Sequence, residues 1–237
     1  MGRYNFDKIV DRKHTKSLKY DFTVQRGKPA DVLPFWVADM DFEIPSELKQ
    51  VLLDRVNHGI FGYTESDVEY FNVLKEWFAN RFNWNIDKKW LVKTPGVVFA
   101  LAMAVRAFTK EGEGVLINQP VYYPFSMVID DNDRNLINVP LIRGEDKYSI
   151  DFEGVERAII EHNVTLFLLC NPHNPVGRVW TEDELKRLGD ICIKYNVIII
   201  SDEIHADFVW DGHKHTVFAD LGESYAEHCI VCTAPSK

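Results

Sequence analysis

The chain has 237 residues, of which 46% are hydrophobic, and this is enough apolar sequence for one or two domains with a buried core. Its formal net charge is −9 at pH 7, which argues against a nucleic-acid partner, because nucleic-acid-binding proteins usually carry a basic face. The first 17 residues contain no apolar signal-peptide core and no stretch approaches the apolar length of a membrane span, so we expect a cytoplasmic protein that does not enter a membrane.

The N-terminal part is predicted to be irregular sequence followed by two helices. Residues 1–44 are rich in aromatic side chains and show no helical pattern. A first helix is predicted between a start signal at Pro45 and Ser46 and a stop signal at Gly59. A second helix is predicted from Thr64. Its apolar face, at helical spacing, consists of Val68, Phe71, Leu74 and Phe78.

From residue 94 onward, apolar helices and apolar strands alternate. Residues 94–108 are apolar almost all round, so we expect a helix that is buried on every side. Runs typical of fully buried strands occupy residues 114–118, 165–170, 197–201 and 229–233. Between the second and third runs, Thr181 and Glu184 form a capping box. The apolar stripe of that helix consists of Leu185, Leu188, Ile191 and Cys192. This alternation predicts an α/β fold with a mostly parallel sheet and helices on both faces.

Two of the four cysteines, Cys229 and Cys232, form a C-x-x-C pair within the last strand. Residues three apart on a strand point to opposite faces of the sheet. This spacing therefore argues against a zinc or redox site, and no metal site is predicted. The cysteines lie mostly in apolar runs, as reduced core cysteines do.

Ligands of parallel α/β sheets bind beyond the carboxyl ends of the strands, so the residues that follow each strand are candidates for a site. In chain order, the four strands deliver Tyr122, then Asn174, then Asp202 with His205 three residues on, and finally Lys237. Upstream, "TPGVV" places a glycine and free backbone N–H groups at a helix start, which is a favourable anion site.

Each of these residues also has an ordinary explanation. The glycine can be a turn, and "NPHNPVG" can be plain turn chemistry, since Asn, Pro and Gly dominate turns. Asp202 can be a helix cap, Tyr122 a core or rim residue, and a C-terminal lysine a solvated charge. Together, however, they match what one cofactor needs. Pyridoxal phosphate requires a phosphate site, an aromatic to stack on its ring, a donor to its phenolic oxygen, a carboxylate at its pyridine nitrogen and a Schiff-base lysine.

The motifs "NPHNPVG", "SDEIHADFVW" and "APSK", in this order and spacing, resemble the fold-type-I pyridoxal-phosphate enzymes of the class I/II aminotransferase family. Within that family, "FWVADMDF", "FGYT" and "SDEIHADFVW" look like the cystathionine β-lyase-like (C–S lyase) branch. The resemblance covers essentially the whole chain.

The resemblance assigns three catalytic residues. It implies that Lys237 is the Schiff-base lysine and later moves a proton, that Asp202 pairs with the pyridine nitrogen, and that Tyr122 stacks on the ring. Asn174 is expected to contact the phenolic oxygen and the substrate. His205 takes the position where many relatives carry a tyrosine near that oxygen.

The remaining implied contacts concern the phosphate, the substrate and a second subunit. The phosphate is expected to be held by the Ser236 hydroxyl and by the backbone of Gly96, Val97 and Val98; many relatives have a further serine where this chain has Ala234. Ala38 and Asp39 lie in the segment that closes over the substrate in relatives. Tyr63 matches a tyrosine that reaches into the neighbouring subunit's site, which implies a homodimer with shared active sites.

The resemblance also implies a domain division. Residues 60–237 would be the large cofactor-binding domain, ending at the Schiff-base lysine, and residues 1–59 an N-terminal segment and part of the small domain. Relatives continue past the lysine by about one further small domain, which normally carries the arginine that binds the substrate carboxylate. We therefore expect the printed chain to be partial; a genuine truncation would leave the site incomplete.

For function, the resemblance implies a C–S β-lyase that cleaves cystathionine- or cysteine-type amino acids to pyruvate, ammonia and a thiol. A class I/II aminotransferase is the alternative, because it uses the same residues and the same electron sink. A third alternative is a non-catalytic ligand-sensing domain of the kind fused to DNA-binding regulators. Against it, residues 1–44 show no winged-helix pattern and the chain is acidic.

Overall fold

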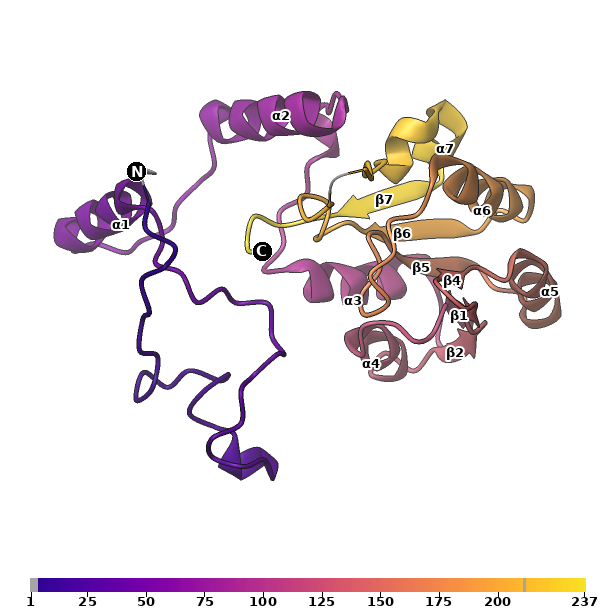
Figure 1. Cartoon of the computed structure of the whole chain (residues 1–237). Helices are drawn as coiled ribbons and strands as arrows, with labels where there is room; N and C mark the ends of the chain where they lie inside the picture. The colour runs from indigo at the N-terminus through magenta and orange to yellow at the C-terminus, as the bar shows by residue number, and fades with distance from the viewer. Residues whose placement is uncertain (1–3, 211) are drawn as a thin grey trace. The chain divides into compact units, whose positions relative to one another are not determined.

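The computed structural model describes residues 4–210 and 212–237. The chain divides into two compact units (Figure 1). The first unit runs to Glu65 and also takes in Lys237, and the second runs from Ser66 to Ser236.

The first unit contains little regular structure. It has a 3-10 turn, η1 (Val24–Arg26), and one helix, α1 (Ser46–His58). The predicted first helix is thus confirmed, and it ends because Gly59 adopts a left-handed conformation, with φ of 77°.

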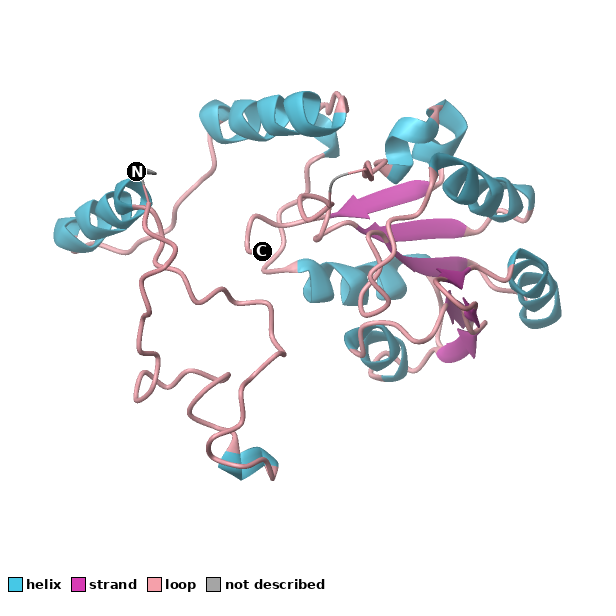
Figure 2. Cartoon of the chain, viewed as in Figure 1, coloured by secondary structure: helices cyan, strands magenta, loops and turns pink. Residues whose placement is uncertain are grey.

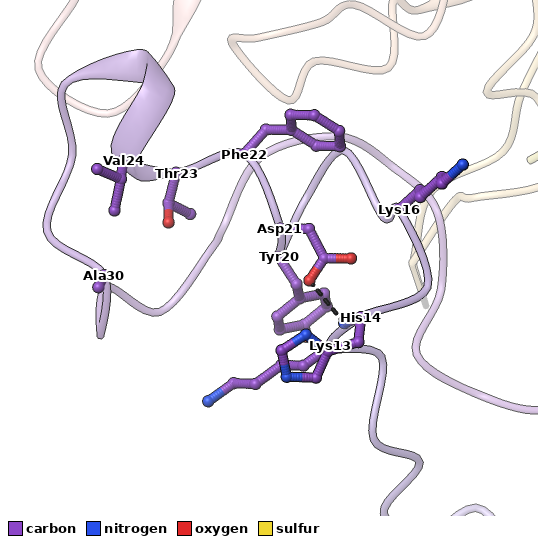
Figure 3. A pocket seen from close by; sticks show the side chains of 9 residues that line it. All are labelled: Lys13, His14, Lys16, Tyr20, Asp21, Phe22, Thr23, Val24 and Ala30. Carbon is purple, nitrogen blue, oxygen red and sulfur yellow. Dashed lines mark hydrogen bonds between the residues drawn. The ribbon is translucent and has the colours of Figure 1, made fainter.

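Upstream of η1, a loop is closed by a single carboxylate. Asp21 accepts hydrogen bonds from the backbone N–H groups of His14 (2.9 Å) and Ser17 (3.0 Å), and these bonds lower the pKa of Asp21. Figure 3 shows the bond to His14 beside the shallow surface pocket that this loop borders.

The second unit is built around a five-stranded parallel sheet, drawn in magenta in Figure 2. Its strands are β1 (Gly114–Ile117), β2 (Asn135–Asn138), β5 (Leu166–Cys170), β6 (Ile198–Asp202) and β7 (Cys229–Cys232), in the spatial order β2-β1-β5-β6-β7. A separate antiparallel pair consists of β3 (Ile142–Arg143) and β4 (Tyr148–Ser149). The four predicted strands are confirmed. The short edge strand β2 was not predicted, because its sequence, "NLIN", has only two apolar residues.

Helices cover both faces of this sheet, as predicted (Figure 1). The α-helices of the unit are α2 (Val68–Phe82), α3 (Val97–Phe108), α4 (Pro124–Asp130), α5 (Phe152–His162), α6 (Glu182–Lys194) and α7 (Glu223–Glu227), and its 3-10 helices are η2 (Lys88–Trp90) and η3 (Phe218–Leu221). In the part of the chain that the structure describes, no helix is both long enough and apolar enough to span a bilayer.

Side chains alternate along each strand and so supply two separate cores. On β5, Phe167 and Leu169 pack with residues of α5 and α6, whereas Leu166 and Leu168 pack with residues of α3 and α4. The C-x-x-C pair follows the same rule, as expected: Cys229 contacts the first core and Cys232 belongs to the second. All four cysteines are free thiols.

Two predictions about helices were wrong. The second helix begins at Val68 rather than at Thr64, because the Asp67 side chain caps it by accepting the Tyr70 N–H at 3.1 Å. Helix α3 is not buried on every side. Only one of its faces meets the sheet. Val98, Phe99 and Met103 outside that face are exposed, as is Phe108 at the C-terminal end of the helix.

Candidate active site

The candidate site is built at the carboxyl edge of the sheet, around the last residue of β6. Asp202 lies in register with Cys170 of β5 on one side and with Cys232 of β7 on the other. The backbone on both sides is tied to it: the Asn171 N–H donates to the Asp202 carbonyl at 2.9 Å, and the Glu203 N–H donates to the Cys232 carbonyl at 2.8 Å. The position of Asp202 is therefore fixed by the two strands that flank β6.

The Asp202 side chain is only 5% exposed. Its Oδ1 accepts the Ile204 N–H at 3.2 Å, so Asp202 does cap the turn that follows the strand. A carboxylate this deeply buried is stable only with charged or hydrogen-bonding partners, and the Ile204 N–H is one of them. Asp202 is therefore both the cap of this turn and a buried acid at the edge of the sheet.

A backbone hydrogen bond joins two of the predicted site residues. The Tyr122 N–H donates to the Asn174 carbonyl at 2.9 Å, so the loop after β1 and the loop after β5 are held together. Burial raises the pKa of Tyr122, and electrostatic interactions with Tyr123 and with the Asp202 carboxylate raise it further. The Asp202 carboxylate thus lies within electrostatic reach of the Tyr122 hydroxyl.

The Asn174 loop is itself anchored by an arginine. Arg178 binds both carboxylate oxygens of Glu184, at 2.8 and 2.7 Å, and its guanidinium lies over the Trp180 ring, 4.7 Å from the centroid. The Trp180 indole N–H donates to the Cys170 carbonyl at 2.9 Å. Because Glu184 also completes the predicted capping box with Thr181, one carboxylate ties the loop to the start of α6.

Another residue of the same loop, His173, is a buried and neutral imidazole. Burial is the main cause that lowers its pKa to about 4, and the charge of Arg178 lowers it further, while a hydrogen bond with the backbone of Asn118 acts in the opposite direction. His173 therefore carries no charge at neutral pH and shapes the loop by packing against Trp180.

The start of α3 offers backbone donors. Gly96 is the N-cap, and no side chain among the described residues caps the helix by a hydrogen bond. The first N–H groups of an α-helix have no partner within the helix, and together with the helix dipole they favour an anion. Val97 is buried and Val98 exposed, so this first turn lies at the border of the core.

The site segments meet in one apolar cluster. Val97, Tyr122, Ile204 and Ala234 all pack in the core on the α3 side of the sheet. The helix start, the Tyr122 loop, the turn after Asp202 and the segment that precedes Ser236 and Lys237 are therefore neighbours. His205 follows in the same turn and is half-buried. Ser236 and Lys237 are exposed.

Ala38, Asp39 and Tyr63 belong to the first unit, and all three are exposed. The Asp39 carboxylate pairs with Arg12, which also binds Asp41 at 2.6 Å. Lys19 donates to the Asp39 carbonyl at 3.2 Å. Two cations therefore fix the conformation of the "ADMD" segment.

The sequence-based reasoning missed a buried polar cluster directly after Asp202. Glu203 is 2% exposed and His215 is 4% exposed, and their side chains meet at 2.8 Å. The sequence "SDEIH" contained a signal for this cluster. It places a second acid directly after a buried strand, where a charged side chain cannot be solvated. Its partner lies twelve residues on in an irregular loop, which no periodicity identifies.

Comparison with known proteins gives one family. The family model described as "Aminotransferase class I and II" matches residues 30–237. Cystathionine beta-lyase PatB of Bacillus subtilis is 44% identical over 98% of this chain, and the match spans 60% of the length of that relative.

Solved structures agree with this chain over nearly its whole length. A PLP-bound putative aminotransferase from Clostridium difficile 630 has a TM-score of 0.94 at 44% identity, and cystalysin from Treponema denticola, which contains pyridoxal 5'-phosphate, has a TM-score of 0.92 at 41% identity. In both cases the match covers 98% of this chain and 60% of the solved chain.

Proposed function

Because the chain belongs to the class I and II aminotransferase family, we propose that it is the cofactor-binding part of a pyridoxal-phosphate-dependent C–S β-lyase. The substrates would be cystathionine- or cysteine-type amino acids, and the products pyruvate, ammonia and a thiol. The observation that carries the proposal is the buried Asp202 carboxylate, placed at the sheet edge beside a helix start that no side chain in the described part of the chain caps.

The residues present fit the cofactor group by group. The phosphate fits the free N–H groups at Val97 and Val98, with the Ser236 hydroxyl as a further donor. A protonated pyridine nitrogen would pair with the buried Asp202 carboxylate through a charge-assisted hydrogen bond. The side chain of Asn174 would donate to the phenolic oxygen, and Tyr122 would lie against the ring. His205, in the turn after Asp202, would lie near the same oxygen.

When bound, pyridoxal phosphate supplies an electron sink for negative charge at the substrate Cα. Asp202 would keep the proton on the ring nitrogen, which strengthens that sink. The Lys237 amine would bind the cofactor between turnovers, and during turnover it would remove the Cα proton. The Cβ–S bond then breaks and the sulfur leaves as a thiolate. Over the whole reaction, one water is consumed and the amino acid yields pyruvate, ammonia and the thiol.

We also propose how the domains and subunits contribute to this chemistry. Residues 60–237 would form the large domain and residues 1–59 would contribute to the small domain. Ala38 and Asp39 would line the substrate side, with Arg12 and Lys19 holding their segment. Tyr63 would reach the site of a second subunit in a homodimer, and the protein would act in the cytoplasm.

A solved structure from Staphylococcus hominis that is titled a PLP-bound C-S lyase matches this chain with a TM-score of 0.90 at 34% identity. That title and the name of the Bacillus subtilis relative favour lyase over aminotransferase chemistry. The deciding experiment is product analysis with cystathionine on the full-length protein. We expect pyruvate, ammonia and homocysteine in equal amounts. A keto acid that retains the sulfur, formed together with the aminated cofactor, would instead identify an aminotransferase.

A further inference from the structure

A long loop leaves the sheet immediately after Asp202 and returns at η3. Its two ends are closed by one carboxylate. Glu203 Oε2 contacts His215 Nε2 at 2.8 Å, while Glu203 Oε1 accepts the Ser201 hydroxyl and the Phe218 N–H, both at 2.9 Å. One side chain therefore joins β6, the end of the loop and η3.

Further contacts fix the same end of the loop. Asn171, the first residue after β5, donates through its side chain to the Thr216 carbonyl at 3.2 Å. The Phe82 ring meets the His215 imidazole edge-on, with centroids 5.5 Å apart. The loop end at residues 215–218 is thus held from β5, β6 and α2.

The hydrogen bonds assign the donor nitrogen of the imidazole. His215 Nδ1 is buried and has no hydrogen-bond partner among the described residues. A proton on Nε2 lets the ring donate to Glu203. Glu203 then receives three hydrogen bonds, which satisfy both of its buried carboxylate oxygens.

The strand geometry links this cluster to the site. Successive side chains on β6 point to opposite faces. Asp202 therefore shares the face of Ile200, on the α3 side, while Glu203 shares the face of Ser201 on the other side. With Glu203 bonded at both carboxylate oxygens, the backbone between Asp202 and Glu203 cannot rotate without breaking buried hydrogen bonds.

We propose that Glu203 and His215 are positioning residues that hold the Asp202 carboxylate, and with it the turn carrying His205, in register for the cofactor's ring nitrogen. A pair of packed apolar residues could close the loop equally well, so closure alone does not require buried polar groups. Hydrogen bonds are directional, so they also fix the orientation of the backbone at residue 202, which apolar contacts do not. The proposal rests on the proposed function, because it assumes that Asp202 faces the pyridine ring.

The test uses the full-length holoenzyme and a variant remote from Asp202 in sequence. His215→Leu removes one donor to Glu203, whereas His215→Gln keeps an N–H donor at the same place. Since displacing a catalytic group by about 1 Å can cost about 100-fold, we expect His215→Leu to lower kcat about 10- to 100-fold. We also expect weaker cofactor binding and an altered absorption spectrum and pH titration of the bound cofactor. His215→Gln should restore all four of these properties.

Thr109→Val is the matched control, because Thr109 is also a buried side chain with two hydrogen bonds, to Val105 and from Arg134, but lies before β1 at the opposite edge of the sheet. It should lower the unfolding temperature and leave the bound spectrum unchanged. If His215→Leu does not fold, Glu203→Gln, which keeps the side-chain volume, is measured in the same way.

The possible results of these measurements distinguish the proposed function from the positioning role of Glu203 and His215. Wild-type protein that does not bind pyridoxal phosphate would overturn the proposed function. Wild-type protein that binds it, together with folded His215→Leu or Glu203→Gln protein of unchanged cofactor affinity and spectrum, would overturn only the positioning role. A spectrum that His215→Gln fails to restore would also count against that role.

Discussion

The backbone N–H of Tyr122 donates to the carbonyl oxygen of Asn174 across 2.9 Å. This bond joins loops that leave two adjacent strands, β1 and β5. A displacement of either loop is therefore transmitted to the other. The predicted ring-stacking residue and the predicted donor to the phenolic oxygen are therefore held as one unit.

Lys237 is expected to carry the cofactor covalently, because in the chain it follows β7 directly after Ser236, three residues beyond Ala234 of the apolar cluster. The purified full-length protein should be yellow because of the bound cofactor. Borohydride reduction should fix the cofactor irreversibly to Lys237, where peptide mass spectrometry would detect it as a label. A colourless protein after addition of cofactor, or a label on another lysine, contradicts this assignment. Lys237→Ala is the control, and it should remain unlabelled.

Asp202→Asn should impair turnover far more than folding. An amide cannot hold a proton on the ring nitrogen, and a charge contact in a dry site is worth several kcal/mol, so we expect turnover to fall about 100-fold or more. Steady-state kinetics and thermal unfolding of the same preparation separate the two effects. Near wild-type turnover with bound cofactor would leave Asp202 as the cap of the Ile204 turn and nothing more.

Arg178→Met should destabilise the second unit by about 1–3 kcal/mol, since it removes charge-assisted hydrogen bonds to a mostly buried carboxylate. Urea unfolding of the wild type and the variant gives this difference directly. A change below about 0.5 kcal/mol, the level of an ordinary exposed pair, would show that the bidentate contact does not stabilise the fold.

Glu184, the partner of Arg178, should make the unfolding free energy depend on pH. Burial acts to raise the pKa of Glu184, but the Thr181 N–H and the Arg178 guanidinium outweigh it, so the pKa lies below its usual value. A lowered pKa contributes stability that is present above the unfolded-state pKa, about 4.3, and is lost as the pH falls through the folded-state value. Between pH 6 and pH 3, the wild type should therefore lose more unfolding free energy than Glu184→Gln. Parallel curves for the two proteins would rule out this contribution.

Tyr63 tests the shared active site. If each site borrows Tyr63 from its neighbour, an inactive Lys237→Ala subunit mixed with an inactive Tyr63→Phe subunit should regain activity. Random pairing gives about half heterodimers, each with one intact site. Subunit exchange is verified first with differently tagged subunits. A mixture as inactive as its parents would place Tyr63 in its own subunit or outside the site.

The residues of the carboxyl edge could be predicted because each follows a strand with a strong apolar signal. The sequence of "TEDELKRL" likewise predicts the capping box that the structure contains. The outer face of α3 could not be predicted, because its apolar composition is the same on both sides and only tertiary neighbours determine which side is covered. The pairing of Glu203 with His215 could not be predicted for a related reason. Both residues lie outside helices and strands, and their contact depends on how the loop closes.

Cys192 and Cys232 lie in the two separate cores of the sheet and so give the chain two independent chemical reporters. Burial raises the pKa of Cys232 to about 12 and raises that of Cys192 as well, so both react with an alkylating reagent only after the protein opens. Cys192 belongs to the core under α6, and Cys232 to the core under α3. Their alkylation rates, read by peptide mass spectrometry, would therefore measure how often each face of the same sheet opens.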